Sequence, residues 1–489
     1  MYTGKGFERS ELGDIDIIEH QGLFHLFHLV LPNHDYIAHA VSHDGFLWKR
    51  VKNPLFIGEP GDWDDDMLWT MHVSADPDGP AAFRMFYTGL SRKEDGKIQR
   101  IGLARSNDLY HWEKVSSANY PLSISSPFYE ENINEGRNWV SCRDPFFFRE
   151  GDRRYLLVNA RVPFGPIARR GCIGLAEERT PDEFEWKPPL FFPRMYDDVE
   201  VPGLHKIANR YYLFGNIKED VKVHYWYSDS LDSDFEAFAS NVLLPRGNYA
   251  ARVLPYKGKF LVWNFFNSLS DPVKILPPPT ELIVNSNGQL SLKSYWLFDE
   301  KVQSRKENKD LFPVQRLLKN PTASINHDSS SLSMTSKSGY EIFMIKGRAS
   351  DFRLKCRISF NGPGKTGLVF RSDREANGHY VSLDLIAGLA QARIWGTREG
   401  GGIENAFRYD IIQNNHFDPH PEQAYDVELV TYGGYMELSI DGRIILRYVD
   451  TTYIEQESLG FYVESAEIHL EGLKVEILDG PLEEDHQLF

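Results

Sequence analysis

An internal repeat constrains the fold of this 489-residue chain more than any other feature of its sequence. One element, a turn followed by a strongly apolar strand, occurs five times in order. The copies are Gly22–Phe27, Ala82–Tyr87, Arg154–Val158, Arg210–Phe214 and Gly258–Trp263. They divide the chain into units of about 50 to 70 residues, which is typical of a four-stranded blade in a ring that leaves only short, protected edges. The repeat therefore predicts an all-β fold that begins with a five-bladed β-propeller over residues 1–300.

A second repeated pattern follows the apolar strand in three of the units. Ile37–Trp48 and Ile101–Trp112 share the spacing Ser-x-Asp-x-x-x-Trp, and Ile173–Trp186 is a weaker copy. Each copy predicts a strand, a turn rich in acidic residues, and a strand that begins near a tryptophan. An ordinary sandwich with coincidental similarity is the alternative, but five ordered copies argue against it.

The rest of the chain has a different rhythm. Residues 301–320 are basic and polar, which predicts a linker or a short helix between domains. Strands then follow at regular spacing, and Asp441-Gly442 supplies a hairpin turn. This pattern predicts an antiparallel β-sandwich over residues 321–480, followed by an acidic tail at 481–489.

Composition excludes several classes of function. A net charge of −16 repels phosphate backbones, so we expect no nucleic-acid partner. No apolar run approaches the roughly 18 residues of a membrane helix, so we expect no membrane partner. Three cysteines at unrelated spacings predict neither a disulfide framework nor a zinc site, and nothing else calls for a metal or cofactor. The first residues lack a secretory pattern, so we expect a cytoplasmic protein; no feature indicates an oligomeric state.

Three acidic residues stand where the channel of a propeller should be. The first strand of each blade lines the channel, and the segments before three of the apolar strands contain Asp14, Asp144 and Glu200 among apolar residues. A buried carboxylate is costly unless it is paired or used. Each one alone is explained equally well by a salt bridge to an arginine such as Arg143. Three at matched positions instead favour glycosidic cleavage, which needs one protonated acid and one nucleophile or base.

The register of the repeat selects Asp14 over Asp16. Asp14 precedes His25 by 11 residues, as Asp144 precedes Tyr155, whereas Asp16 precedes His25 by 9. Alternation along a strand places Asp14 and Asp16 on the same face. Asp16 therefore remains a reserve candidate, either for substrate contact or for support of Asp14.

Four further residues are candidates for binding a small oligosaccharide substrate. His34 and Asp35 precede a strand and are placed to hydrogen-bond sugar hydroxyls, although a plain turn explains them as well. Trp69 is either a stacking wall for a sugar ring or a tryptophan of the blade core. Arg143 is expected to orient Asp144 or a substrate hydroxyl.

These residues resemble the motifs of glycoside hydrolase family 32, the invertase and inulinase group. Arg143-Asp144-Pro145 is similar to the Arg-Asp-Pro motif of the family, and Glu200-Val201-Pro202 stands where the family has Glu-Cys. Tyr249-Ala250-Ala251-Arg252 resembles its later Tyr-Ala segment. The expected propeller and sandwich also match the architecture of the family over nearly the whole chain.

The chain also departs from the family pattern. The first motif, Asn-Asp-Pro-Asn-Gly, is here Gly13-Asp14-Ile15-Asp16-Ile17, so only the aspartate carries over. Val201 replaces the cysteine after the glutamate, and Trp69-Thr70 lies where Ser-Gly-Ser is usual. Propeller enzymes of family 43, which cleave arabinofuranosides and xylosides, likewise use Asp, Asp and Glu, so that group is the alternative.

The resemblance implies a mechanism. Asp14 would be the nucleophile, Asp144 would bind sugar hydroxyls and stabilise the transition state, and Glu200 would be the acid/base in a hydrolysis of terminal β-fructofuranosides with retention. A family 43 type would invert; the carboxyl separation distinguishes the two, at about 5–5.5 Å for retention and about 6.5–9.5 Å for inversion. Fructosyl transfer and a carbohydrate-binding protein without catalysis are the remaining alternatives.

Overall fold

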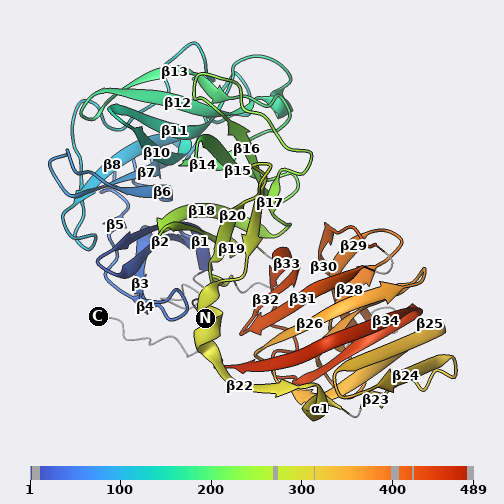
Figure 1. Cartoon of the computed structure of the whole chain (residues 1–489). Coiled ribbons are helices and arrows are strands. Elements are labelled where there is room, and N and C mark those ends of the chain that lie inside the picture. The colour runs from blue at the N-terminus through green and yellow to red at the C-terminus, as the bar shows by residue number, and fades with distance from the viewer. Residues whose placement is uncertain are drawn as a thin grey trace.

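The computed structural model describes residue 2 and residues 11–267, 274–312, 314–397, 407–420 and 423–481. Two all-β parts follow one another along the chain, a ring of five sheets and a large antiparallel sheet (Figure 1). The predicted five-bladed propeller followed by a β-sandwich is therefore confirmed. Residues 482–489, nearly all of the predicted acidic tail, lie outside the described residues.

Each blade is an antiparallel sheet whose strands are joined in sequence order. Blade 1 contains β1 (Glu11–His20), β2 (Leu23–Leu31), β3 (Tyr36–Ser42), β4 (Lys49–Arg50) and the short β5 (Leu55–Phe56). Blade 2 contains β6 (Met67–Ala75), β7 (Phe83–Leu90), β8 (Arg100–Ser106) and β9 (Glu113–Lys114). Blade 3 contains β10 (Arg143–Glu150), β11 (Arg153–Arg161), β12 (Gly171–Thr180) and β13 (Glu183–Phe191). Blade 4 contains β14 (Glu200–Ile207), β15 (Arg210–Ile217), β16 (Lys222–Ser228) and β17 (Val242–Leu244). Blade 5 contains β18 (Asn248–Tyr256), β19 (Lys259–Phe266), β20 (Thr280–Val284) and β21 (Leu290–Lys293).

The repeated apolar strand of the sequence is the second strand of each blade. In β7 all eight residues are buried, because this strand has a sheet neighbour on each edge and other blades against its faces. The first strands β1, β6, β10, β14 and β18 each contact the first strands of both neighbouring blades and so close the ring. They are the elements that line its centre.

The Ser-x-Asp-x-x-x-Trp pattern forms a hydrogen-bonded turn between the third and fourth strands. In blade 1 the Ser42 hydroxyl accepts the Gly45 N–H at 2.9 Å, and Asp44 accepts the Phe46 N–H at 2.8 Å. The Trp48 indole N–H donates to the Gly45 carbonyl at 3.2 Å. The copy at 106–112 in blade 2 makes the same set of bonds, so the spacing reflects one turn that is used twice.

The C-terminal part is a sheet of 13 strands within the described residues. Its strands are β22 (Val302–Glu307), β23 (Gln315–Arg316), β24 (Ala323–His327), β25 (Ser331–Arg348), β26 (Phe352–Asn361), β27 (Lys365–Ser372), β28 (Gly378–Asp384), β29 (Leu389–Thr397), β30 (Phe407–His416), β31 (Ala424–Tyr432), β32 (Tyr435–Ile440), β33 (Arg443–Val449) and β34 (Ser458–Leu478). The long strand β34 pairs with β27 over its first half and with β26 over its second, and the two wings of the sheet diverge from it.

The segment between the two parts has structure of its own. A 3₁₀-helix, η3 (Trp296–Lys301), precedes β22, which pairs with the end of β34. A single helical turn, α1 (Asn308–Leu311), and β23 follow within the predicted 301–320 linker. Two other 3₁₀-helices, η1 (Arg92–Glu94) and η2 (Ile167–Arg169), lie in propeller loops.

A shared core joins the propeller to the sandwich. Phe46 of blade 1 packs edge-on against Phe298 at 5.1 Å and against Tyr432 of β31 at 5.2 Å between ring centroids.

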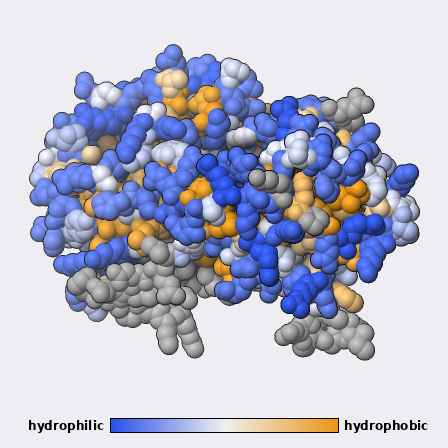
Figure 2. All heavy atoms as spheres, turned by 60° about the horizontal axis from the view of Figure 1, so that its bottom comes forward, coloured by the Kyte–Doolittle hydropathy of each residue, from blue (hydrophilic) through white to orange (hydrophobic). Residues whose placement is uncertain are grey.

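On the face shown in Figure 2, hydrophobic residues form separate small patches among hydrophilic ones, as on ordinary protein surfaces. Among the described residues, no helix has the length and apolar character to cross a membrane.

Candidate active site

Each first strand contains a β-bulge at the same place in its blade. The bulges lie between Leu12 and Ile15, Trp69 and Met71, Arg143 and Phe146, Glu200 and Gly203, and Tyr249 and Arg252. A bulge leaves extra residues without a partner on the neighbouring strand and turns their side chains out of the regular alternation. Five bulges in one ring therefore aim side chains from all five blades at the centre.

The bulges divide the centre of the ring into layers. Trp69, Arg143, Glu200 and Tyr249 stand just before a bulge, and all but Arg143 are partly exposed. Asp14, Thr70 and Asp144 lie within a bulge, where Asp14 is partly exposed and the other two are buried. The residues just after the bulges are all buried. Partly exposed side chains therefore occur just before and within the bulges, whereas the residues just after the bulges are out of reach of solvent.

Asp14 is held by Thr70 of the neighbouring blade. The Thr70 hydroxyl donates a hydrogen bond to Asp14 Oδ2. Burial raises the pKa of Asp14 to about 7, the negative charges of Asp144 and Glu200 add to this shift, and the Thr70 hydrogen bond opposes it. Asp14 is thus a carboxyl group near the midpoint of its titration at neutral pH.

Asp144 is held by backbone contacts in a left-handed conformation, with φ of 58°. Its Oδ2 accepts the Val201 N–H at 3.0 Å, and its own N–H donates to the Thr88 hydroxyl at 3.1 Å. Burial raises the pKa of Asp144, with the charge of Glu200 adding to the shift and Arg143 opposing it. The position is rigid because its bonds come from two neighbouring blades.

Glu200 accepts hydrogen bonds from two side chains. Arg143 Nη2 lies 2.6 Å from Glu200 Oε1, and the Tyr249 hydroxyl donates to Glu200 Oε2. Burial raises the pKa of Tyr249, and the charge of Glu200 raises it further, so the phenol keeps its proton and acts as a donor. Glu200 retains 17% of its side-chain exposure, which leaves its carboxyl group reachable.

Arg143 connects the acidic residues. Besides Glu200 it contacts Asp198 Oδ2 at 3.1 Å, and its Nε lies 3.6 Å from Asp144. Burial opposes the charge on Arg143, but Asp198, Asp144 and Glu200 raise its pKa well above the ordinary value. Asp198 is shared with Arg137 at 2.6 Å. The sequence predicted that Arg143 orients Asp144 or a substrate hydroxyl; in the structure its shortest contact with an acid is with Glu200 at 2.6 Å.

Arg252 forms the floor of the site. This buried guanidinium donates to the carbonyls of Ile15 at 3.3 Å, Pro202 at 2.9 Å and Met71 at 3.1 Å, in blades 1, 4 and 2. It also lies over the Phe146 ring of blade 3, 5.7 Å from the centroid. Since Arg252 itself belongs to blade 5, one side chain contacts all five blades.

Asp16 lies below this floor, not beside Asp14. It is buried and pairs with Arg252 Nε at 2.9 Å, and it accepts the Val73 N–H at 2.6 Å. The alternation that predicted a shared face for Asp14 and Asp16 is interrupted by the bulge at 13–14. No described contact brings Asp16 to the three other carboxylates, so its place in the structure is a supporting one.

The remaining candidates divide into two groups. His34 and Trp69 face each other at 6.2 Å between ring centroids, and the buried atoms His34 Nδ1 and Trp69 Nε1 have no hydrogen-bond partner in the described structure. Burial lowers the pKa of His34, so its ring is neutral. Asp35 is exposed in the following turn. His34 and Trp69 thus offer free polar atoms near the mouth, and Asp35 lies outside it.

Sequence reasoning assigned no role to Thr70, Tyr249, Asp198 or Arg252. Thr70 and Tyr249 lie in the first strands of blades 2 and 5, which carry no carboxylate at the bulge, so a search for acidic residues passes over them. Asp198 stands two residues before Glu200, so a second acidic residue close to Glu200 is apparent in the sequence. The signal for Thr70, Tyr249 and Arg252 is the repeat itself, because each occupies or adjoins the bulge position of its blade.

The arrangement brings together carboxyl groups that can serve as general acid, general base or nucleophile. Among the described residues, no group of three or more His, Cys, Asp or Glu side chains is placed to hold a metal ion. The three cysteines are buried and unpaired. Burial raises the pKa of both Asp14 and Asp144, so these two acids hold their protons to higher pH than ordinary aspartates. Glycosidic cleavage requires one protonated and one ionised carboxyl group at the same site.

Comparison with known proteins gives one family and one fold. Residues 15–232 match the N-terminal domain of glycosyl hydrolases family 32. No curated protein sequence matches the chain significantly. The match begins one residue after Asp14, so the placement of Asp14 rests on the structure.

Several solved structures share the fold over nearly the whole chain. Fructan 1-exohydrolase IIa from Cichorium intybus has a TM-score of 0.68 at 14% identity, covering 96% of this chain and 95% of that chain. Exo-inulinase from Aspergillus awamori has a TM-score of 0.67 at 12% identity, covering 96% of each chain. The family 32 β-fructofuranosidase of Bombyx mori has a TM-score of 0.66 at 14% identity, covering 96% of this chain and 92% of that chain.

Variants of two of these enzymes were solved with sugars bound. The Bombyx mori enzyme was solved with sucrose and the Cichorium intybus enzyme with 1-kestose. At such low identities these structures establish the architecture, and the family match covers the blades that carry Asp144 and Glu200. Residues 15–232 therefore match the N-terminal domain of glycosyl hydrolases family 32, and nearly the whole chain shares the fold of the solved fructan 1-exohydrolase and β-fructofuranosidase structures.

Proposed function

We propose that this chain is a glycosidase that hydrolyses terminal β-fructofuranosides with retention of configuration. The observation that supports this most is the convergence of Asp14, Asp144 and Glu200 at three bulges of one ring, with Asp14 and Glu200 open to solvent. A bulge costs regular hydrogen bonds and persists where it re-aims a side chain. Three re-aimed carboxyl groups fit a catalytic role better than a structural one.

We assign each group a role that its contacts support. Asp14, as the ionised form favoured by the Thr70 hydrogen bond, attacks the anomeric carbon. Glu200 gives a proton to the leaving oxygen and then takes one from the attacking water, with Arg143 and Tyr249 fixing its carboxyl group. Asp144, fixed by Val201 and Thr88, places negative charge beside the oxocarbenium-like transition state and accepts hydrogen bonds from the sugar hydroxyls.

The free atoms at the mouth suit a sugar ring. His34 Nδ1 and Trp69 Nε1 are unsatisfied in the described structure, and a substrate hydroxyl satisfies a buried polar atom of this kind. The partner that these atoms support is a small oligosaccharide with its terminal unit among the carboxylates.

Purified protein assayed side by side on sucrose, inulin and aryl arabinofuranosides tests the substrate class. Release of fructose is expected, and release of arabinose with inverted configuration would transfer the chain to a family 43 type of reaction. NMR of the first-formed sugar reports the configuration, and the ratio of free fructose to longer products separates hydrolysis from transfer.

Two substitutions test the roles. Glu200→Gln and Asp14→Asn should each lower kcat by about 10²–10⁴-fold while the circular dichroism spectrum stays that of the parent. Asp232→Asn, at an exposed carboxylate in blade 4, is the matched control and should retain parental rates. Near-parental turnover in Glu200→Gln would show that Glu200 is not part of the mechanism. If the parent turned over none of the sugars, the alternative of a carbohydrate-binding protein without catalysis would be favoured.

A further inference from the structure

A second cavity lies at the outer junction of blades 3 and 4, apart from the carboxylate site. It has a volume of about 850 Å³ and is walled by the end of β13, the loop that follows it, the β11–β12 loop and one face of β16. A pocket of this size accommodates a ligand of several rings. None of the catalytic candidates lines it.

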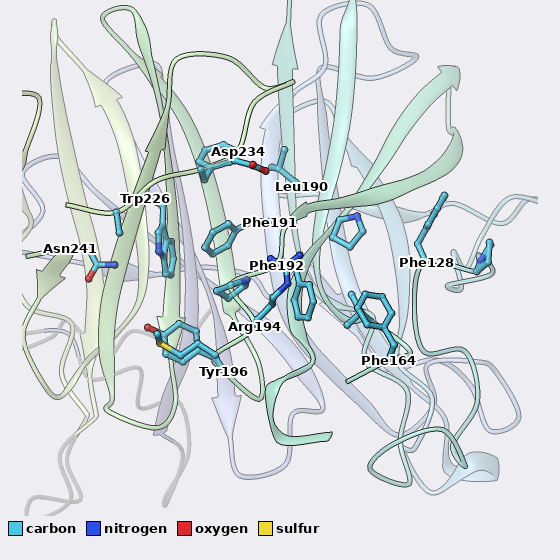
Figure 3. A pocket seen from close by; sticks show the side chains of 17 residues that line it. Phe128, Phe164, Leu190, Phe191, Phe192, Arg194, Tyr196, Trp226, Asp234 and Asn241 are labelled. Atoms are coloured by element: carbon cyan, nitrogen blue, oxygen red, sulfur yellow. The ribbon is translucent and has the colours of Figure 1, made fainter. Parts of the chain in front are cut away.

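Aromatic side chains form a row along this cavity. Figure 3 shows Trp226, Phe191, Phe192, Phe164 and Phe128 in succession from blade 4 to blade 3. Phe191 lies 4.6 Å from Trp226, and Phe164 lies 5.8 Å from Phe192, between ring centroids. Phe164 is 59% exposed, so part of the row faces water. An elongated row of rings fits an extended ligand better than a compact one.

Charged groups border the same row. Arg194 lies over the Phe192 ring at 5.0 Å, with φ of 59° at a residue that is not glycine. Asp234 lines the opposite side of the cavity. Neither Arg194 nor Asp234 has an ion-pair partner within the part of the chain that the structure describes. Aromatic faces beside uncommitted hydrogen-bonding groups suit a ligand with both apolar faces and hydroxyls, which is the chemistry of a sugar chain.

The cavity is close to the catalytic carboxylates along the chain. Tyr196 lines the cavity, and the next two residues, Asp197 and Asp198, bind Arg161 at 2.7 Å and Arg137 at 2.6 Å. Glu200 is the fourth residue after Tyr196, so their Cα atoms are at most about 14 Å apart. An oligosaccharide whose terminal unit occupies the carboxylate site therefore has only a short distance to cover to reach the cavity.

We propose that the aromatic cavity between blades 3 and 4 is an accessory binding site for the outer units of an oligosaccharide substrate. Apolar faces of successive sugar rings stack on Phe164, Phe192 and Phe191, and their hydroxyls bond to Arg194 and Asp234. This inference rests on the proposed glycosidase function, because it takes the ligand of the cavity to be the far end of the chain cleaved at Asp14 and Glu200.

Chain-length kinetics test the inference. The double variant Phe164→Ala/Phe192→Ala should raise KM for long inulin-type chains by about two- to tenfold per ring removed, leaving kcat and KM on sucrose unchanged. Phe407→Ala, which removes an equally exposed phenylalanine (60%) from the sandwich, is the matched control and should change neither. An active parent with no preference for longer chains, or a double variant that keeps the parental KM for them, would overturn the proposal.

A binding measurement separates this inference from the proposed function. Isothermal titration of Glu200→Gln protein with a long inulin-type oligosaccharide should give weaker binding when Phe164 and Phe192 are also replaced by Ala, whether or not the parent turns over. The fluorescent probe anilinonaphthalene sulfonate provides a competition assay. Displacement of the probe by the oligosaccharide is expected, whereas probe binding that the oligosaccharide does not disturb would make the cavity a site for apolar molecules and contradict the proposal.

Discussion

The Asp14–Thr70 pair shows how one hydroxyl tunes a buried carboxyl group. Burial and the neighbouring acids raise the pKa of Asp14 to about 7, while Thr70 holds it down by favouring the ionised form. For the nucleophile of the proposed reaction, only the ionised form attacks. The rate should therefore fall as pH drops through the pKa of Asp14, and Thr70 should set where that fall occurs.

Thr70→Val should move the acid limb of the kcat/KM profile to higher pH. Valine keeps the shape and removes the donor, so the ionised form of Asp14 loses a charge-assisted hydrogen bond of about 1.5 kcal/mol, equivalent to about one pH unit. Thr70→Ser retains the donor and should keep the parental profile. A valine variant with an unmoved acid limb would show that Asp14 does not control it.

Asp14→Asn should change how stability depends on pH. The pKa of Asp14 is about 7 in the folded protein against 3.8 for an ordinary aspartate, so between these values the folded state binds more protons than the unfolded state. Stability from this group therefore falls as pH rises from about 4 to 7 and then levels off. Asparagine has no proton to lose, so the variant should gain about 1–3 kcal/mol over the parent between pH 4 and pH 8 in urea unfolding. A difference that is constant with pH would contradict the raised pKa.

At the scale of strands, the bulges and the arginine beneath them act as one unit. The left-handed residues Asp144, Val201 and Ala250 have φ of 58°, 47° and 51°, a conformation that is costly outside glycine and persists only where surrounding contacts impose it. Arg252 supplies such a contact beside Val201 by fixing the Pro202 carbonyl, and it also fixes the carbonyls of Ile15 and Met71, which directly follow the bulges of blades 1 and 2.

Arg252→Met should destabilise the propeller by about 3–5 kcal/mol, because it removes the guanidinium partner of the buried Asp16 and the donor to three backbone carbonyls. Urea unfolding measures the loss. The double variant Arg252→Met/Asp16→Asn should recover part of it, since the buried charge that lost its guanidinium partner is gone. Arg149→Met removes an exposed arginine from the first strand β10 and should cost less than about 1 kcal/mol. Equal losses in the free energy of unfolding for Arg252→Met and Arg149→Met would show that Arg252 stabilises the protein no more than an exposed arginine does.

The sequence predicted the blades because their second strands are buried on both faces and read as strongly apolar runs, as the mainly apolar and fully buried β7 does. Asp144 and Glu200 could be predicted for the same reason, since an acid in such surroundings stands out. The bulges were not predicted, although Gly13, Pro145 and Pro202 lie within three of them and such residues often mark a break in a strand. That is why Asp16 was placed beside Asp14, and why Thr70 and Tyr249, neutral residues of blades without an acid, received no role.

At the scale of the molecule, a buried arginine of the sandwich is set into blade 5. Arg447 of β33 donates to the Asn264 side chain, to the Asn248 side chain at 3.2 Å and to the Pro278 carbonyl at 2.7 Å. The edge of the sandwich sheet reaches the same residue, because Gln413 of β30 bonds both the N–H and the carbonyl of Arg447 at 2.7 Å. Arg447 therefore takes part both in closing the sandwich sheet, through its backbone, and in docking the sandwich on the propeller, through its side chain.

Arg447→Met should uncouple the two parts of the chain. Removing the guanidinium takes the donor away from the Asn264 side chain and the Pro278 carbonyl in a buried interface, at a cost of about 2–5 kcal/mol that falls mainly on docking, whereas the lost bond to the Tyr435 hydroxyl falls on the sandwich. Calorimetry should then resolve two unfolding transitions where the parent shows one, because neighbouring parts unfold together only while their interface is strong. Arg443→Met removes an exposed arginine from the same strand and should keep the single transition. A single, merely shifted transition in the Arg447 variant would mean that the aromatic core around Phe46 and Tyr432 is sufficient to hold the two parts together.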